Sequence, residues 1–231
     1  MAISRSDILA NLVEPPQCYC LVEQPSAVAE REKLKAELIS MGSRPNISEN
    51  AVVESESDLS VILSTPLGIH LAYGLAYTVG SALGSIPPSI HVCLTAFTLP
   101  NKVHLTAGAR AWSKHAHRSI VDDTPTPKKE PPTGWWGNPS GSVQKVNENA
   151  LALFWKIFGT STWRNLHWLP HSVLVYEVRI AEGYGMRWSQ DQSMKDSLDA
   201  DADAEMPPWI FRGFVEPMME NGHELGWRHA P

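Results

Sequence analysis

The feature that most constrains the fold is a stretch from Leu59 to Asn101 that contains no Asp, Glu, Lys or Arg. So long a run without charge needs burial, either within the protein or in a membrane. Residues 67–83, LGIHLAYGLAYTVGSAL, include His70, two tyrosines and three glycines, whereas a bilayer span needs about 20 strongly apolar residues. We therefore expect a buried core helix over 67–84, with membrane association of 67–83 as the minor alternative.

Two other segments have helical periodicity. Residues 26–41, SAVAEREKLKAELISM, begin with a capping Ser26, place Leu34 and Leu38 on one face and precede Gly42. Residues 143–158 repeat apolar side chains at helical spacing and end before Gly159. Both segments are predicted to be helices that pack on a sheet.

Other segments alternate with the period of two that is typical of strands. Residues 89–99 and 102–112 flank Pro100-Asn101 and predict a hairpin. Further strands are predicted at 171–180, 186–190 and 209–215. The expected fold is α+β, a mostly antiparallel sheet of about five strands with helices packed on it, in a single domain.

The domain is expected to span residues 26–231. Prolines interrupt residues 1–25, which predicts an extended N-terminal arm. Polar, Pro-rich or acidic stretches predict flexible loops near 119–134 and 190–207. The acidic stretch lacks the central Gly and terminal Glu of an EF-hand loop, so no calcium site is expected there.

Charge and cysteine content suggest the compartment and partners. The formal net charge is −6, and without a basic stripe we expect no nucleic-acid partner. Three cysteines, two of them in Cys18-x-Cys20, favour a reducing compartment. The N-terminal residues are too weakly apolar for a secretory signal, so a cytoplasmic location is expected.

Histidines are the first candidates for chemistry, because the imidazole pKa lies near neutrality. His115 and His117 are alternate residues that could address one ligand from an extended segment. His167 precedes His171 by four residues, but Pro170 argues against a helix that would align them. Solvated loop histidines and core packing are the alternatives, and no bound metal or other cofactor is expected.

The C-terminal segment EPMMENGHELGWRH is the densest cluster of ionisable residues. A carboxylate of this segment, Glu216 or Glu224, could form an acid–base pair with His223 if burial shifts their pKa values. The segment lacks the second His of an HExxH zinc site. A charged amphipathic tail with Trp227 packed inward is the alternative.

Aromatic residues flanked by glycine predict a ligand pocket, because glycine permits tight turns beside flat side chains. All nine tryptophans lie at or after Trp112. Phosphate-binding loops and a nucleophile elbow are both absent from the sequence. The candidate binding residues are Trp135, Trp136, Arg164, Asn165, Tyr184, Arg187 and Trp227.

The phrases VYEVRIAEGYGMRWS and FRGFVEPMMENGHELGWRH, with KHAHRS upstream, resemble a group of small uncharacterised fungal proteins. The resemblance extends over about residues 90 to 229. It implies no activity and transfers no functional residue.

Two functions from different classes follow. The first is a small-molecule enzyme or biosynthetic tailoring protein, with His and Glu as acid and base in an aromatic-lined pocket. Its candidate catalytic residues are His115, His117, His167, His223, Glu224 and Glu216. The second is a non-catalytic interaction or structural protein whose tryptophans form only the core. Whether the chain is an enzyme stays open.

Overall fold

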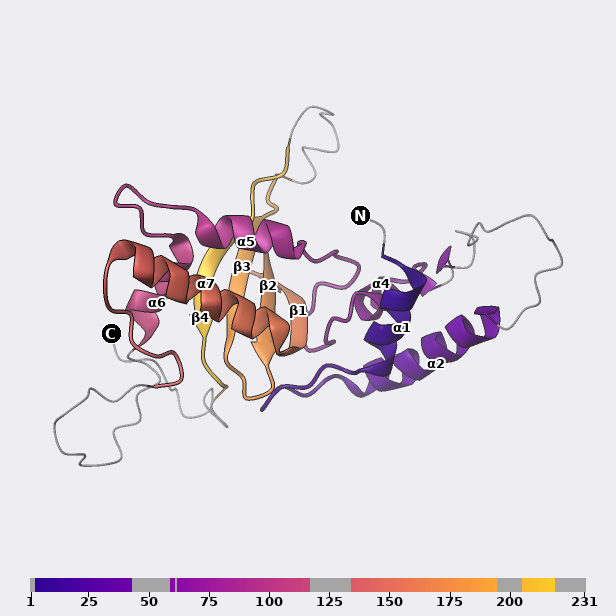
Figure 1. Ribbon diagram of the computed structural model, residues 1–231. Helices are drawn as coiled ribbons and strands as arrows, with labels where there is room; N and C mark the ends of the chain where they lie inside the picture. The colour runs from indigo at the N-terminus through magenta and orange to yellow at the C-terminus, as the bar shows by residue number, and fades with distance from the viewer. Residues whose placement is uncertain (1–2, 43–58, 61, 117–133, 195–204, 219–231) are drawn as a thin grey trace, which may run out of the picture.

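A four-stranded antiparallel sheet forms the centre of the fold (Figure 1). The computed structural model describes residues 3–42, 59–60, 62–116, 134–194 and 205–218. The strands lie in the order β1-β2-β3-β4. Each strand therefore pairs with its neighbours along the chain, and the bounds are β1 Ser161–Leu169, β2 Val173–Ile180, β3 Gly185–Asp191 and β4 Ile210–Val215.

Three helices cover one face of this sheet, namely α5 Ile90–Thr98, α6 Ala107–His115 and α7 Val143–Gly159 (Figure 1). Because strand side chains alternate between faces, Tyr176 and Val178 of β2 point into this layer. They join Phe97, Phe154 and Trp188 in the larger hydrophobic core. Figure 1 shows none of the three helices on the opposite face, which carries Glu177 and Arg179.

The N-terminal helices form a second core beside β1 (Figure 1). They are α1 Arg5–Val13, α2 Pro25–Gly42 and α4 Pro66–Ala72. Ile8 and Leu12 of α1 pack with Leu34 and Leu38 of α2 and with Leu71 of α4, all almost completely buried. The apolar stripe predicted for residues 26–41 is thus confirmed as a buried helix face.

Two connecting segments join this core to the sheet along β1. Ala76 N donates to Arg164 O at 2.7 Å, and Ala82 N donates to Leu166 O at 2.7 Å. Gln17 N also donates to Thr162 O at 2.9 Å. These bonds satisfy backbone groups that an edge strand would otherwise leave open to another chain.

The α+β fold is confirmed, but the hairpin predicted over residues 89–112 is wrong. That region forms α5 and α6, which begin at the N-caps Ser89 and Thr106. The cap side chains accept from Val92 N and Ala109 N, which satisfies helix-end donors. Short apolar runs are compatible with both the helical and the strand period. Here the N-caps and the burial of one side against the sheet favour a helix.

Other boundaries also differ from expectation. The helix expected over 67–84 ends at Ala72, and the positive φ angles of Gly74 and Gly80 help turn the chain into the segment beside β1. The expected N-terminal arm contains α1, capped by Ser4. Four strands occur in the described residues, with β1 where no strand was predicted.

Most of the loops expected near 119–134 and 190–207 lies outside the described residues. None of the helices within the described ranges is long and apolar enough to span a membrane.

Candidate functional site

The sheet face opposite α5, α6 and α7 is here called the open face. It carries a row of polar residues. In this row Asn165 of β1 pairs with Glu177 of β2, Glu177 pairs with Arg187 of β3, and Arg187 pairs with Gly213 of β4. Directly paired residues project to the same side. The fold therefore brings an amide, a carboxylate and a guanidinium from three strands together.

Glu177 is held by two arginines. Arg179 Nε donates to Glu177 Oε1 at 2.5 Å, and Arg187 Nε donates to Oε2 at 2.6 Å. The side chains of Glu177 and Arg179 are 4% and 3% exposed, whereas that of Arg187 is 36% exposed. The carboxylate is thus buried between one enclosed guanidinium and one that reaches solvent.

These charges determine the ionisation of Glu177. Burial raises the pKa of the carboxyl group, but the attraction of Arg179 and Arg187 and the Arg179 hydrogen bond outweigh burial and leave the pKa below 4.5. Glu177 is therefore a carboxylate at neutral pH, and it fixes the orientation of the Arg187 guanidinium.

His167 lies on the same face, one pleat along β1 from Asn165. It pairs with Val175, so it is diagonal to Glu177 across the two strands. Burial lowers the pKa of His167 below 6.5, and Arg187 and Arg179 lower it further, while Glu177 opposes them. No hydrogen bond joins the His167 ring to any residue in the described ranges. The ring is therefore a neutral base on a residue that is partly exposed.

Buried polar contacts fix the surrounding residues. Asn165 Nδ2 donates to Thr78 Oγ1 at 2.9 Å, and Ser81 Oγ donates to Asn165 Oδ1 at 3.1 Å. Arg179 Nη1 also donates to Glu216 O at 2.7 Å. Asn165 therefore belongs to the support of β1, and Arg179 links the open face to the chain after β4.

A second group of predicted residues gathers where α6 ends. His115 Nε2 lies 3.1 Å from Glu216 Oε1. Trp135 stacks on Tyr184 with ring centroids 4.4 Å apart, and Trp136 meets Tyr184 edge-on at 5.3 Å. Burial raises the pKa of Tyr184, and Glu216 raises it further. These residues converge, but in a cluster separate from His167 and Arg187.

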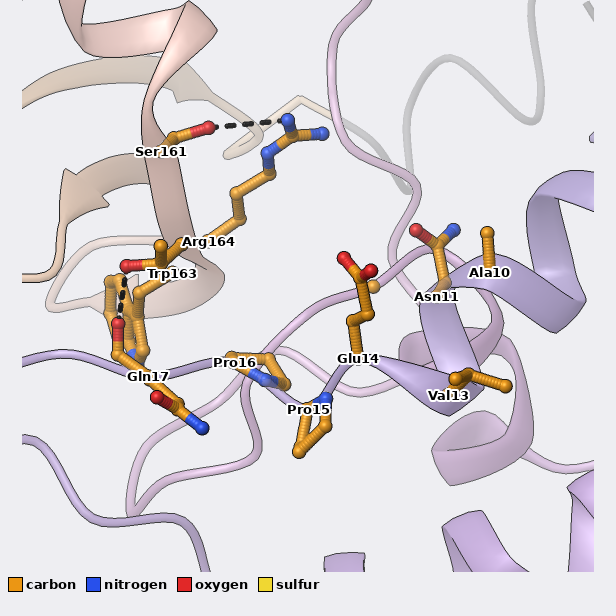
Figure 2. A pocket seen from close by; sticks show the side chains of 12 residues that line it. Ala10, Asn11, Val13, Glu14, Pro15, Pro16, Gln17, Ser161, Trp163 and Arg164 are labelled. Atoms are coloured by element: carbon orange, nitrogen blue, oxygen red, sulfur yellow. Dashed lines mark hydrogen bonds between the residues drawn. The ribbon is translucent and has the colours of Figure 1, made fainter.

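Arg164 lies elsewhere, in a cavity between α1 and the start of β1 (Figure 2). The remaining predicted residues, His117, His223, Glu224 and Trp227, lie outside the described residues. In the described ranges, no three His, Cys, Asp or Glu residues form a group that could hold a metal ion.

Sequence reasoning missed Glu177 and Arg179. Both lie in VLVYEVRI, which was predicted correctly as a strand. The available signal was their spacing: two opposite charges two apart in an otherwise apolar strand must share a face. A buried strand tolerates such charges only when they are paired.

Residues 96–199 match a family model described as the CdiA C-terminal tRNase toxin domain. The match extends from α5 past β3 and includes Asn165, His167, Glu177, Arg179 and Arg187. No curated protein and no solved structure matches the chain.

This match overturns the predicted small-molecule enzyme or tailoring protein, and with it the small-molecule ligand. It gives no support to the alternative of a non-catalytic interaction protein. The exclusion of nucleic acid is also wrong, because a tRNase acts on a nucleic acid.

The error about nucleic acid came from averaging charge over the whole chain. Residues 96–199 contain twelve Lys and Arg against nine Asp and Glu, a net charge of +3. The rest of the chain contains seven basic and sixteen acidic residues, a net charge of −9. The matched segment is basic, as phosphate binding favours.

Proposed function

We propose that this protein is a ribonuclease that cleaves tRNA on the open face of its sheet. The observation that carries the proposal is that the segment matching a tRNase family model contains the strands that present His167, Glu177 and Arg187 together. Glycine at position 213 completes the row beside Arg187 without a side chain.

The proposed reaction uses the ribose 2′-hydroxyl of the substrate as nucleophile. His167 accepts the hydroxyl proton while the 2′-oxygen attacks phosphorus. The bond between phosphorus and the 5′-oxygen breaks, and the leaving oxygen takes a proton from water. Protonated His167 then gives its proton to the hydroxide that remains, which restores the water and the neutral base. The products are a 2′,3′-cyclic phosphate and a 5′-hydroxyl end, so no oxidant, reductant or second substrate is required.

Arg187 is proposed to bind the scissile phosphate with the exposed part of its guanidinium. Positive charge placed beforehand at the phosphate stabilises the charge that develops in the transition state. His167 and Arg187 lie two strands apart and two residues apart along the strands, about 12 Å at the usual strand spacing and rise. Their side chains can close on a ribose and its phosphate between them. Glu177 acts as a positioning residue, because its carboxylate accepts a hydrogen bond from Arg187 Nε and orients the guanidinium.

Incubation of purified protein with tRNA tests the proposal. We expect discrete tRNA fragments that end in a cyclic phosphate, and a loss of about 100-fold or more in kcat/KM for His167→Gln. His91→Gln, an exposed histidine of α5, is the matched control and should cleave at the wild-type rate. Absence of tRNA cleavage by the folded wild-type protein, or full activity of His167→Gln, would reject the proposal.

A further inference from the structure

A cavity between the N-terminal helices and the sheet is separate from the open face (Figure 2). Its volume is about 480 Å³, within the range of small-molecule sites. One wall comes from α1 and the residues after it, and the other from β1. The α1 wall lies outside the segment that matches the family model, so the comparison assigns nothing to this site.

Opposite charges face this cavity without pairing to each other. Figure 2 shows Glu14 extending from the end of α1 into the space between this helix and β1, while the Arg164 guanidinium points toward Ser161. Arg164 Nη2 donates to Ser161 Oγ at 3.2 Å, which is its only side-chain hydrogen bond to the residues that the structure describes. Over the same ranges the Glu14 carboxylate has no ion-pair partner. The cavity therefore offers a donor fork and an acceptor pair.

Flat and buried groups complete the walls. Pro15 and Pro16 line the side next to Glu14, and Trp163 lines the side next to Arg164. Trp163 is 3% exposed, and its indole N–H has no hydrogen-bond partner among the residues that the structure describes. An unpaired buried donor is costly, so an acceptor or ordered water that reached it would stabilise the site.

We propose that this cavity binds a guanine base of the RNA substrate, an inference that rests on the proposed function. Guanine presents O6 and N7 as acceptors on one edge, which suit an arginine fork. Its N1–H and N2–H donors lie on the adjoining edge, where the Glu14 carboxylate can accept both. Adenine has a donor in place of O6 and lacks both of these donors, so it fits neither wall.

Binding can be tested without cleavage by using His167→Gln protein and guanosine 5′-monophosphate. The Trp163 indole N–H signal, assigned by its loss in Trp163→Phe, should move in the NMR spectrum on titration. Adenosine 5′-monophosphate should bind about tenfold more weakly or worse. Glu14→Gln should reduce guanosine monophosphate binding by a similar factor, whereas Glu182→Gln, an exposed glutamate in the β2–β3 turn, should leave it unchanged.

Competition between guanosine monophosphate and tRNA in the wild-type protein tests whether the ligand of this cavity is a base of the RNA substrate or a free nucleotide. Guanosine monophosphate should inhibit tRNA cleavage with the affinity measured by NMR. Equal binding of the two nucleotides, absence of binding, or guanosine binding that does not compete with tRNA would overturn the inference. If tRNA is cleaved and His167→Gln abolishes cleavage, the proposed function survives that failure. Guanosine-selective binding by a protein that cleaves no tRNA would instead reject the function and the RNA origin of the base.

Discussion

The proposed chemistry depends on the protonation of one histidine, His167. Its pKa is held below 6.5, first by burial and then by the two arginines, with Glu177 acting in the opposite direction. A general base must be neutral to accept a proton. His167 can therefore act as a base at lower pH than a histidine with an unperturbed pKa.

The pH profile of tRNA cleavage should follow from these charges. We expect kcat/KM to be constant near pH 7 and to fall with acid, with its half-maximum below pH 6.5. Glu177→Gln removes a charge that raises the His167 pKa and should move this acid limb to lower pH. Arg187→Gln removes a charge that lowers it and should move the limb to higher pH.

Steady-state rates between pH 4.5 and 8 locate the acid limb of the wild type and of each variant. Glu182→Gln serves as a control that should leave the profile unchanged. Shifts of the two variants in the same direction would contradict the assignment of His167 as the base.

The same carboxylate should matter for stability. Glu177→Gln leaves Arg179, which is 3% exposed, without its anion. Removing one partner of a buried pair costs more than the pair itself contributes. We expect the free energy of unfolding to fall by about 3 kcal/mol, measured by urea denaturation at pH 7, with Glu182→Gln unchanged. A loss near zero would show that the Glu177 carboxylate is well solvated.

At the scale of elements, the contact between α5 and α6 depends on a residue without a side chain. A Cβ added at Gly108 would lie 2.1 Å from the Phe97 ring. Phe97 is 1% exposed and also packs against Phe154 and Phe211. The ring therefore has little room to move, and the two helices meet only because position 108 is glycine.

Gly108→Ala is accordingly expected to destabilise the protein by about 1–3 kcal/mol, the usual cost of overpacking a core. Gly159→Ala is the matched comparison, because that glycine ends α7 and its added Cβ would meet nothing within 4 Å. Its unfolding free energy should stay the same or rise by up to about 1 kcal/mol. Thermal or urea unfolding of both variants measures the difference, and equal stabilities would refute the packing argument.

The same pair of helices shows where sequence reasoning failed. The segment IHVCLTAFT contains β-branched and apolar residues that alternate as in a strand, yet Cys93 and Phe97 lie four apart and share the buried face. Only the cap hydrogen bonds of Ser89 and Thr106 and the packing on the sheet favour a helix. By contrast, α7 was predicted correctly because helical spacing of apolar residues continues along the whole segment 143–158, and the strands predicted at 171–180 and 186–190 also agree with β2 and β3.

Prediction of the site was partial for a different reason. His167 was selected because the imidazole pKa lies near neutrality, Asn165 as a polar donor beside tryptophans, and Arg187 as part of an aromatic motif flanked by glycine. Their assembly depends on strand register, which pairs Glu177 with Asn165 on one side and with Arg187 on the other. Register is determined by the sheet as a whole and cannot be obtained from one strand.

At the scale of the whole molecule, charge is separated along the chain. The matched segment carries +3, while the N-terminal helices and the rest of the chain carry −9. A polyanion such as tRNA is attracted to the first and repelled by the second. We therefore infer that RNA approaches through the sheet part, and that only a local pocket such as that of Arg164 draws a base toward α1.

Acid should destabilise the whole molecule in two steps. Burial is the main cause that lowers the pKa values of His70 and His167 below 6.5. As pH falls through 6.5, the unfolded chain binds protons that the folded protein does not, so stability decreases. Glu177 has a pKa lowered below 4.5, so its contribution is present above pH 4.5 and is lost only as pH falls toward its folded value. The first loss, between about pH 6.5 and 5.5, therefore belongs to the histidines.

His70 tests this effect without removing the proposed base, His167, because it is a different histidine that is fully buried in α4. Its Nε2 lies 3.0 Å from Ala76 O, and within the described ranges its Nδ1 has no hydrogen-bond partner, so protonation would bury a charge. Urea unfolding at pH 7.5 and 5.5 should show a smaller stability difference in His70→Gln than in the wild type, whatever its absolute stability. His91→Gln, a substitution at an exposed position of α5, is the matched control and should keep the full wild-type difference. An undiminished difference in His70→Gln would mean that His70 takes up its proton in the folded protein as easily as in the unfolded chain.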